Sequence, residues 1–204
     1  MRIAIIVEGK TEKVFIGSLR NFLESRLAGR MPKLDTVPQD GEIPSGEKLK
    51  KLVERLLSDR SRRADAVIAL TDVYTGKRRF TDAGDAKRKL REWVGDNAKF
   101  HAHAAQFDFE AWLLPYWSDI QALAKSTKAP PRSNPETINH ERPPSILLKE
   151  VFRQGDARRE YNKIRDAARI LQGKDLEIAA RSCPELRDLL NTILQLCGGR
   201  PLTD

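Results

Sequence analysis

The chain has 204 residues, which suffices for one substantial hydrophobic core or for a core domain with a sizeable appendage. Its 37 Lys and Arg residues outnumber 29 Asp and Glu residues, and the formal net charge is +8. This surplus favours a polyanionic partner such as nucleic acid, although a basic surface without such a partner would have the same composition. No apolar run approaches the length of a membrane span, and Cys183 and Cys197 lack zinc-site spacing. We expect a soluble, cytoplasmic protein with reduced cysteines and no membrane association.

The first element expected is a buried strand over the apolar run Ile3 to Val7. The following Gly9-Lys10-Thr11 looks like the end of a phosphate-binding loop, G-x-x-x-x-G-K-[ST]. That pattern needs a glycine five residues before Gly9, and Ala4 stands there. Because the amides of a buried strand bond to its neighbours, they cannot cradle a phosphate. The segment therefore indicates a strand, a sharp turn and a helix that begins near Thr11.

Two acids flank this turn. Glu8 ends the first strand, and Glu12 follows four residues later near the start of the helix. In a tight turn both carboxylates can converge on one point, which suits a hard cation with oxygen ligands. Alternatively, Glu12 favours the helix N-terminus by its charge and Glu8 is a solvated loop acid. The local pattern leaves both interpretations open.

Alternating strand and helix patterns continue to about residue 117. Apolar residues at helical spacing predict helices over residues 14–27, 49–57 and 83–94. Further strands are expected at residues 34–37, 66–70 and 99–107. This alternation predicts an α/β fold with a parallel sheet of about four strands flanked by helices.

The character of the chain changes near residue 118 to helical runs joined by proline-rich connections. We therefore expect an α/β domain over residues 1–117 and a C-terminal helical extension over residues 118–204 that packs on it. Trp112, Tyr116 and Trp117 are interpreted as core anchors of this part in preference to base-stacking platforms.

Acids occur at corresponding places in the expected sheet. Glu8 follows the first strand, Asp72 the third, and Asp108 and Glu110 the fourth. Parallel strands expose their carboxyl ends along one edge, so these acids can meet there. Close carboxylates repel one another unless a cation neutralises them, which favours Mg²⁺ or Mn²⁺. The competing interpretation is that loops at strand ends are polar anyway. His101 and His103 alternate on one strand face, where polar core residues are more usual than metal ligands.

The segment from Val7 to Phe15 resembles the opening of TOPRIM-type nucleases of the overcoming-lysogenization-defect (OLD) class. Most of the chain is similar to a bacterial domain family, DUF4276. The motifs that carry this similarity are, besides the opening, Leu70-Thr71-Asp72-Val73-Tyr74, Phe107-Asp108-Phe109-Glu110-Ala111-Trp112-Leu113-Leu114, Asn134-Pro135-Glu136, Pro143-Pro144-Ser145, Tyr161-Asn162-Lys163 and Cys183-Pro184-Glu185-Leu186.

The resemblance implies a TOPRIM-like parallel core with an acid after the first strand and a metal-holding D-x-D pair after the third. In this chain Glu8 matches the first acid, and the D-x-D motif begins at Asp72. Glu12 matches an acid that assists metal binding in OLD-like nucleases. Tyr74 replaces its second acid. This departure weakens the expected metal affinity and puts a two-ion mechanism in doubt.

Two later residues extend this correspondence. Glu110 resembles the further acid that OLD-like nucleases place after the next strand. Lys163 matches a late lysine that would steady developing phosphate charge, although a solvated surface lysine is equally ordinary. Lys10 and the cluster Lys77-Arg78-Arg79 are expected to hold a phosphate backbone beside the metal, with a solvated basic face as the alternative.

The function expected is that of a metal-dependent TOPRIM-type nuclease, with Glu8, Asp72 and Glu110 binding Mg²⁺ or Mn²⁺. The resemblance implies an effector in bacterial anti-phage defence with an ABC-type ATPase partner. The sequence leaves the formation of a homo-oligomer open. One alternative is a catalytically silent subunit of an ATPase-containing complex that binds nucleic acid or a partner, which Tyr74 favours. Another is a primase-like nucleotidyl transferase.

Overall fold

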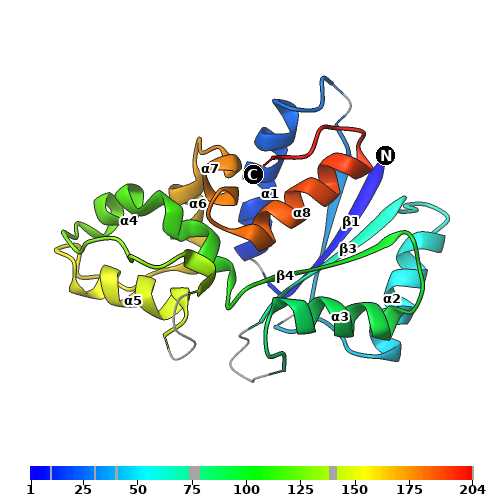
Figure 1. Cartoon of the computed structure of the whole chain (residues 1–204), viewed down its shortest axis with the longest axis horizontal. Helices are drawn as coiled ribbons and strands as arrows, with labels where there is room; N and C mark the ends of the chain where they lie inside the picture. Colours follow the sequence, from blue (N-terminus) through cyan, green and yellow to red (C-terminus); the bar gives the residue numbers. More distant parts are fainter. Residues whose placement is uncertain (10, 30, 40, 74–78, 138–141, 204) are drawn as a thin grey trace.

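The computed structural model describes residues 1–9, 11–29, 31–39, 41–73, 79–137 and 142–203, without the side chains of residues 11–13. Figure 1 shows the whole chain with its elements. In order these are β1 (Arg2–Val7), α1 (Thr11–Glu24), β2 (Lys33–Pro38), α2 (Glu47–Ser58), β3 (Ala66–Asp72), α3 (Ala83–Val94), β4 (Phe100–Ala105), η1 (Phe109–Tyr116), α4 (Trp117–Ala124), η2 (Pro135–Thr137), α5 (Pro144–Gln154), α6 (Lys163–Leu171), α7 (Leu176–Ala180) and α8 (Pro184–Leu196).

The described residues form a four-stranded sheet in the order β2-β1-β3-β4, and every pairing is parallel. The β1–β3 register places Ile3 opposite Ala66 and Val7 opposite Leu70. The β3–β4 pairing runs on to Asp72 opposite Ala105. The expected parallel α/β fold is confirmed. The expected helices and strands are all present, and the fourth strand is shorter than its sequence pattern indicated.

Side chains alternate between the two faces of the sheet and so divide the core. Ile3, Ile5 and Val7 belong to an apolar cluster with α1, η1 and the helices from α4 to α8. Ala4 and Ile6 belong to a separate cluster with α2 and α3. Figure 1 shows α1 and α8 on one side of the sheet and α2 and α3 on the other. Because both faces are covered, the strands are apolar throughout, as a buried parallel sheet requires.

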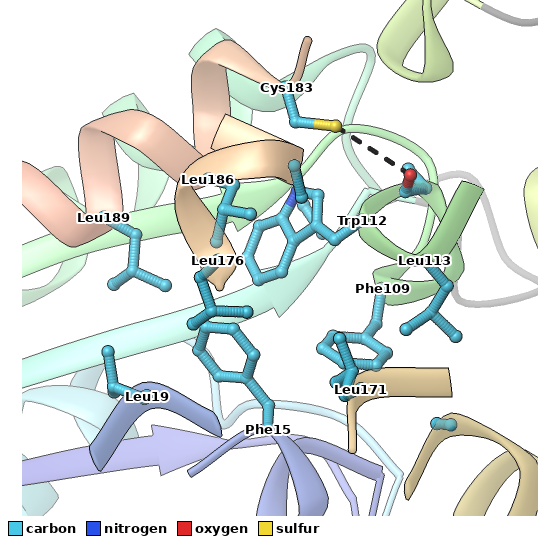
Figure 2. Close-up of a cluster of buried hydrophobic side chains, with 14 of the residues drawn as sticks. Phe15, Leu19, Phe109, Trp112, Leu113, Leu171, Leu176, Cys183, Leu186 and Leu189 are labelled. Carbon is cyan, nitrogen blue, oxygen red and sulfur yellow. Dashed lines mark hydrogen bonds between the residues drawn. The ribbon is translucent and has the colours of Figure 1, made fainter. Parts of the chain in front are cut away.

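The segment η1 joins the sheet to the C-terminal helices. Trp112 is 1% exposed, and its ring lies 5.5 Å from Phe15 of α1 and 5.7 Å from Phe109. Figure 2 shows these rings surrounded by leucines of α1, α7 and α8. Trp112, Tyr116 and Trp117 are all buried, which agrees with their interpretation as core anchors. The apolar cluster continues across residues 117 and 118, and the division into two domains there stays a prediction.

The buried acid Glu136 of η2 holds η1 against α8. Its Oε1 accepts a hydrogen bond from Trp112 Nε1 at 3.1 Å, and its Oε2 accepts one from Glu185 N at 3.1 Å. Asn134 Oδ1 in turn accepts a hydrogen bond from Glu136 N at 2.9 Å. Burial raises the pKa of Glu136 to about 6, although these donors oppose the rise. Three motifs that are far apart in the sequence thus meet at one carboxylate.

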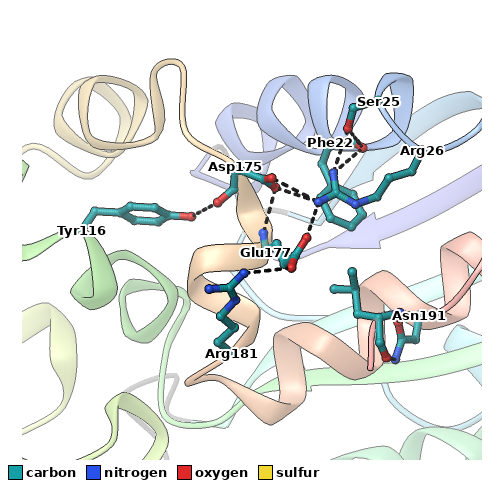
Figure 3. Close-up of polar contacts among 9 residues, drawn as sticks. Phe22, Ser25, Arg26, Tyr116, Asp175, Glu177, Arg181 and Asn191 are labelled. Carbon is teal, nitrogen blue, oxygen red and sulfur yellow. Dashed lines mark hydrogen bonds and ion pairs between the residues drawn. The ribbon is translucent and has the colours of Figure 1, made fainter. Parts of the chain in front are cut away.

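A second polar contact ties α1 to α7. Arg26 pairs with Glu177 at 2.6 Å and with Asp175 at 3.1 Å, and its guanidinium stacks on Phe22. The Tyr116 hydroxyl donates to Asp175 O at 2.9 Å (Figure 3). Cys183 and Cys197 are free thiols, as expected. In the described part of the chain, no helix has the length and apolar character that crossing a membrane requires.

We predict that Gly155→Ala destabilises the protein by roughly 1 to 3 kcal/mol or more. A Cβ at Gly155 would lie 2.1 Å from the backbone oxygen of Ala124, and a backbone atom cannot turn aside. Gly17→Ala is the matched control, because the exposed Gly17 in α1 has no atom within 4 Å of the new Cβ. That change should stabilise by about 0.5 to 1 kcal/mol. Urea unfolding measures both changes. Equal shifts of the unfolding curves of Gly155→Ala and Gly17→Ala relative to the native protein would contradict the prediction.

Candidate active site at the carboxyl edge of the sheet

The carboxyl ends of β1, β3 and β4 bring the sequence-predicted acids to one edge. The chain leaves β1 for β2 on one side and later reaches β3 on the other side, so a topological switch point lies between β1 and β3. Ligands of open α/β sheets bind outside the carboxyl ends at such a point. Glu8 directly follows β1, and Asp72 ends β3.

Glu8 and Asp72 lie side by side. Oε1 of Glu8 accepts a hydrogen bond from Asp72 N at 3.1 Å and a short one from the Thr71 hydroxyl. The backbone oxygen of Glu8 accepts a hydrogen bond from Gly41 N at 3.0 Å. Glu8 is therefore tied to β3 by its side chain and to the loop after β2 by its backbone. Glu8 is 7% exposed and Asp72 is half-buried, so the pair borders solvent.

The next acids follow a sharp turn after β4. Phe107 has φ of 71°, a left-handed conformation that is uncommon for a residue with a bulky side chain. Beyond it, Asp108 Oδ2 accepts a hydrogen bond from Ser145 N at 3.1 Å, at the start of α5. Burial raises the pKa of Asp108 to about 7, and the charge of Glu110 adds to the rise, while Ser145 opposes it. This turn buries both acids inside the protein, where Asp108 is 2% exposed and Glu110 is 0% exposed.

Lys163, the first residue of α6, pairs with Glu110. Its Nζ lies 3.2 Å from Oε1 and 3.4 Å from Oε2 of that acid. Burial alone would lower the pKa of Lys163, but the charges of Glu110, Asp72 and Asp108 outweigh it and raise the pKa. One ammonium group thus lies in the field of acids from β3 and from the segment after β4. The structure brings Glu8, Asp72, Glu110 and Lys163 to the same region.

A buried acid, Asp166, shapes the turn that presents Lys163. It accepts hydrogen bonds from Arg159 Nη1 and Asn162 N, both at 2.7 Å, and from Arg165 Nε at 3.0 Å. Burial would raise its pKa, but these donors lower it to about 2. Asn162 also caps α6 through its side chain. The neighbouring Tyr161 is 6% exposed, and its hydroxyl has no hydrogen-bond partner among the described residues.

Several predicted site residues fall outside the described part of the chain. These are Lys10, Tyr74, Lys77 and Arg78, together with the side chain of Glu12 in α1. Their expected roles stay predictions.

Arg79 is described and is used within the chain. Its Nη1 donates to Ile43 O at 2.9 Å and lies 3.7 Å from Glu42, and the guanidinium is 5.0 Å from the ring centre of Trp93. These contacts join the loop before α2 to the loop before α3. A contact between Arg79 and nucleic acid stays a prediction, since it would have to coexist with these interactions.

His103 lies against α8. Its Nδ1 is 3.5 Å from Asp188, and burial lowers its pKa to about 4, with Asp188 partly opposing the shift. Burial also lowers the pKa of His101. The lower pKa values favour the neutral form of both rings, and His101 Nε2 and His103 Nδ1 are buried without a hydrogen-bond partner among the described residues.

The donors at the carboxyl edge suit a hard divalent cation in kind, because they are carboxylate oxygens. Glu8 and Asp72 supply two such groups at the solvent border, and Asp108 Oδ1 is buried without a hydrogen-bond partner in the described residues. Glu110 is already compensated by Lys163. Within the described ranges, no three His, Cys, Asp or Glu residues are grouped closely enough to hold a metal ion. The fit to one cation thus rests on the Glu8–Asp72 pair.

Sequence reasoning assigned no role to Thr71, Ser145 or Asp166. Thr71 and Ser145 belong to motifs that carry the family resemblance, so that resemblance was the available signal. No motif indicated that Asp166 is buried beside the site. Its partners Arg159 and Arg165 look, in the sequence, like arginines on an exposed surface.

Comparison with known proteins agrees with this architecture. The chain belongs to the family described as a domain of unknown function, DUF4276, whose model matches residues 7–194. Its structure is similar to the C-terminal region of the Burkholderia pseudomallei OLD protein, at 14% identity and a TM-score of 0.52, covering 96% of this chain and 98% of that one. The C-terminal region of the Xanthomonas campestris pv. campestris OLD protein matches at 14% identity and a TM-score of 0.44, covering 96% of each chain.

No curated protein matches the sequence. The resemblance expected from the motifs is nevertheless confirmed for the family and for the OLD-like fold.

We predict that Asp108→Asn changes how stability depends on pH. With a raised pKa, the native Asp108 contributes stability that is fully present below pH 3.8 and is lost as the pH rises through about 7. The variant lacks this loss, so its stability relative to the native protein should increase between pH 4 and 8, by on the order of 1 to 4 kcal/mol. Urea unfolding at several pH values measures this, with Asp156→Asn as an exposed control. Parallel pH profiles for Asp108→Asn and the native protein would refute the assignment.

Proposed function

We propose that this DUF4276 member is a divalent-metal-dependent nuclease of TOPRIM type that cleaves phosphodiester bonds in nucleic acid. The observation that carries the proposal is the hydrogen bond from the backbone N of Asp72 to Glu8 Oε1, which places two acidic residues next to each other at the switch point. The OLD-like parallel α/β fold adds to it, because open α/β sheets bind their ligands outside the carboxyl ends of the strands.

The charges around this pair support phosphoryl chemistry. Lewis-acid polarisation of the phosphodiester is the chemistry that bound Mg²⁺ or Mn²⁺ would supply. Glu8 and Asp72 would hold the ion, with Glu12 assisting from the start of α1. Lys163 stays charged, since the surrounding acids raise its pKa, and its ammonium would stabilise negative charge that develops on the phosphate.

Glu110 has a different role in this proposal. Its carboxylate is fully buried and paired with Lys163 at 3.2 Å, so it orients the lysine and neutralises part of its charge.

Nucleic acid is the substrate class that the charge of the chain favours. The net charge of +8 raises the local concentration of a polyanion around the protein. Lys10, Lys77, Arg78 and Arg79 would hold the phosphate backbone of the nucleic acid. The family resemblance further suggests an effector in bacterial anti-phage defence that acts with an ABC-type ATPase in the cytoplasm.

A second candidate is a catalytically silent subunit that binds nucleic acid or a partner. Tyr74 stands where the D-x-D motif has its second acid, and this favours the silent subunit. The Glu110–Lys163 pair also favours the silent subunit, because Lys163 already neutralises the carboxylate that a metal ion would otherwise neutralise. Calorimetric titration with Mn²⁺ separates the two functions, because the silent subunit needs no ion at the Glu8–Asp72 pair.

We predict that the purified protein cleaves DNA or RNA in the presence of Mn²⁺ and that Glu8→Ala or Asp72→Ala reduces the rate by at least about 100-fold. Lys163→Met should reduce it by about 10- to 1,000-fold, because the charge on the phosphate loses a fixed partner. Gel assays with labelled DNA and RNA measure these rates.

The matched control is Glu54→Ala, which removes an exposed carboxylate of α2 away from the strand ends. It should cleave like the native protein. Cleavage that survives both Glu8→Ala and Asp72→Ala would remove these acids from the mechanism. Absence of Mn²⁺ binding, together with absence of cleavage of either nucleic acid, would favour the silent subunit.

A further inference from the structure

We propose that Thr71 is a positioning residue for Glu8, which fixes the orientation of that carboxylate at the switch point. The inference rests on the proposed function, because it concerns how the chain prepares Glu8 to receive a cation. It adds a residue that touches neither the ion nor the substrate and acts through the acid.

The contacts converge on a single oxygen. Oε1 of Glu8 accepts hydrogen bonds from both the Thr71 hydroxyl and Asp72 N. Thr71 is 2% exposed, so this hydroxyl is shielded from water. A buried hydroxyl that bonds to a carboxylate makes a charge-assisted contact, which is stronger than one between neutral groups. Rotation of the Glu8 carboxylate would break both contacts at once.

The backbone positions this hydroxyl. β1 and β3 pair up to Val7 and Leu70, and the next residues are Glu8, which follows β1, and Thr71 of β3. Threonine is stiff at χ1 because it branches at Cβ, so its hydroxyl follows the position of the strand. Glutamate has more rotatable bonds and loses more conformational freedom when it is fixed. Thr71 is thus a short, rigid donor that orders a longer and more flexible acid.

The Thr71 hydroxyl also lies 3.3 Å from Asp72 O, so a purely local role must be considered. A hydroxyl has one proton to donate. The Glu8 carboxylate is a stronger acceptor than the backbone carbonyl of Asp72. The proton is therefore assigned to Glu8. A local role at the end of β3 would affect stability without changing the orientation of the acid.

Two substitutions separate these roles. Thr71→Val removes the hydroxyl and keeps the shape, whereas Thr71→Ser keeps the hydroxyl. In calorimetric titration with MnCl₂ alone, Thr71→Val should bind about 10- to 100-fold more weakly than the native protein, the usual effect of losing a group that orients a metal ligand. Thr71→Ser should stay within about threefold. Ser18→Ala is the control, since it removes a buried hydroxyl that contacts Leu171 O of α6.

The outcomes distinguish this inference from the proposed function. If Thr71→Val binds Mn²⁺ like the native protein while Glu8→Ala does not, Thr71 has no positioning role and the proposed function stands. If the native protein binds no Mn²⁺, the proposed function fails, and a crystal structure of Thr71→Val without metal decides the inference. A Glu8 carboxylate turned away from Asp72 N supports positioning by Thr71. A carboxylate that stays in place overturns it.

Discussion

The parallel pairing of β1 with β3 is the constraint on which the candidate site depends. Both strands are buried on both faces, so their polar groups are restricted to the ends. Since β2 pairs on the other side of β1, the chain must cross over between β2 and β3, which opens the switch point outside Val7 and Leu70. Glu8 and Asp72 occupy its two sides. A shift of the register by one residue would turn the acids to opposite faces of the sheet.

Compensation of buried carboxylates is the second constraint, and it joins the sheet to the helices. Asp108 bonds to the start of α5, Glu110 pairs with the start of α6, and Glu136 bonds to the start of α8. Helix N-termini suit these acids because unpaired N–H groups and the helix dipole stabilise negative charge there. Lys163 adds a full positive charge at one of these termini. The helical part therefore completes the electrostatics of an edge that the sheet creates.

The sequence supported a large part of the fold. Continuous apolar runs marked β1 and β3, and amphipathic periodicity marked α1, α2 and α3, because burial on two faces or on one imposes those patterns. The structure of the irregular segment after β4 was harder to predict from the sequence. Its acids were recognised, but nothing in the local pattern showed the 3₁₀ geometry of η1 or the left-handed Phe107. Such turns are stabilised by contacts from distant parts of the chain, here Phe15 of α1 and Glu136 of η2.

By itself the sequence predicted where β1 and β3 end, and therefore that Glu8 and Asp72 share one edge of a parallel sheet. Only the tertiary structure decided what each acid contacts: Thr71 bonds to Glu8 across 63 positions, and Lys163 pairs with Glu110 across 53. The physical reason is that the ends of strands follow from the local pattern of hydrophobic residues. The partner of a side chain depends on its rotamer and on how the helices pack, and no periodic pattern in the sequence encodes that packing. A lysine that neutralises a buried acid has the same local sequence signature as one in solvent.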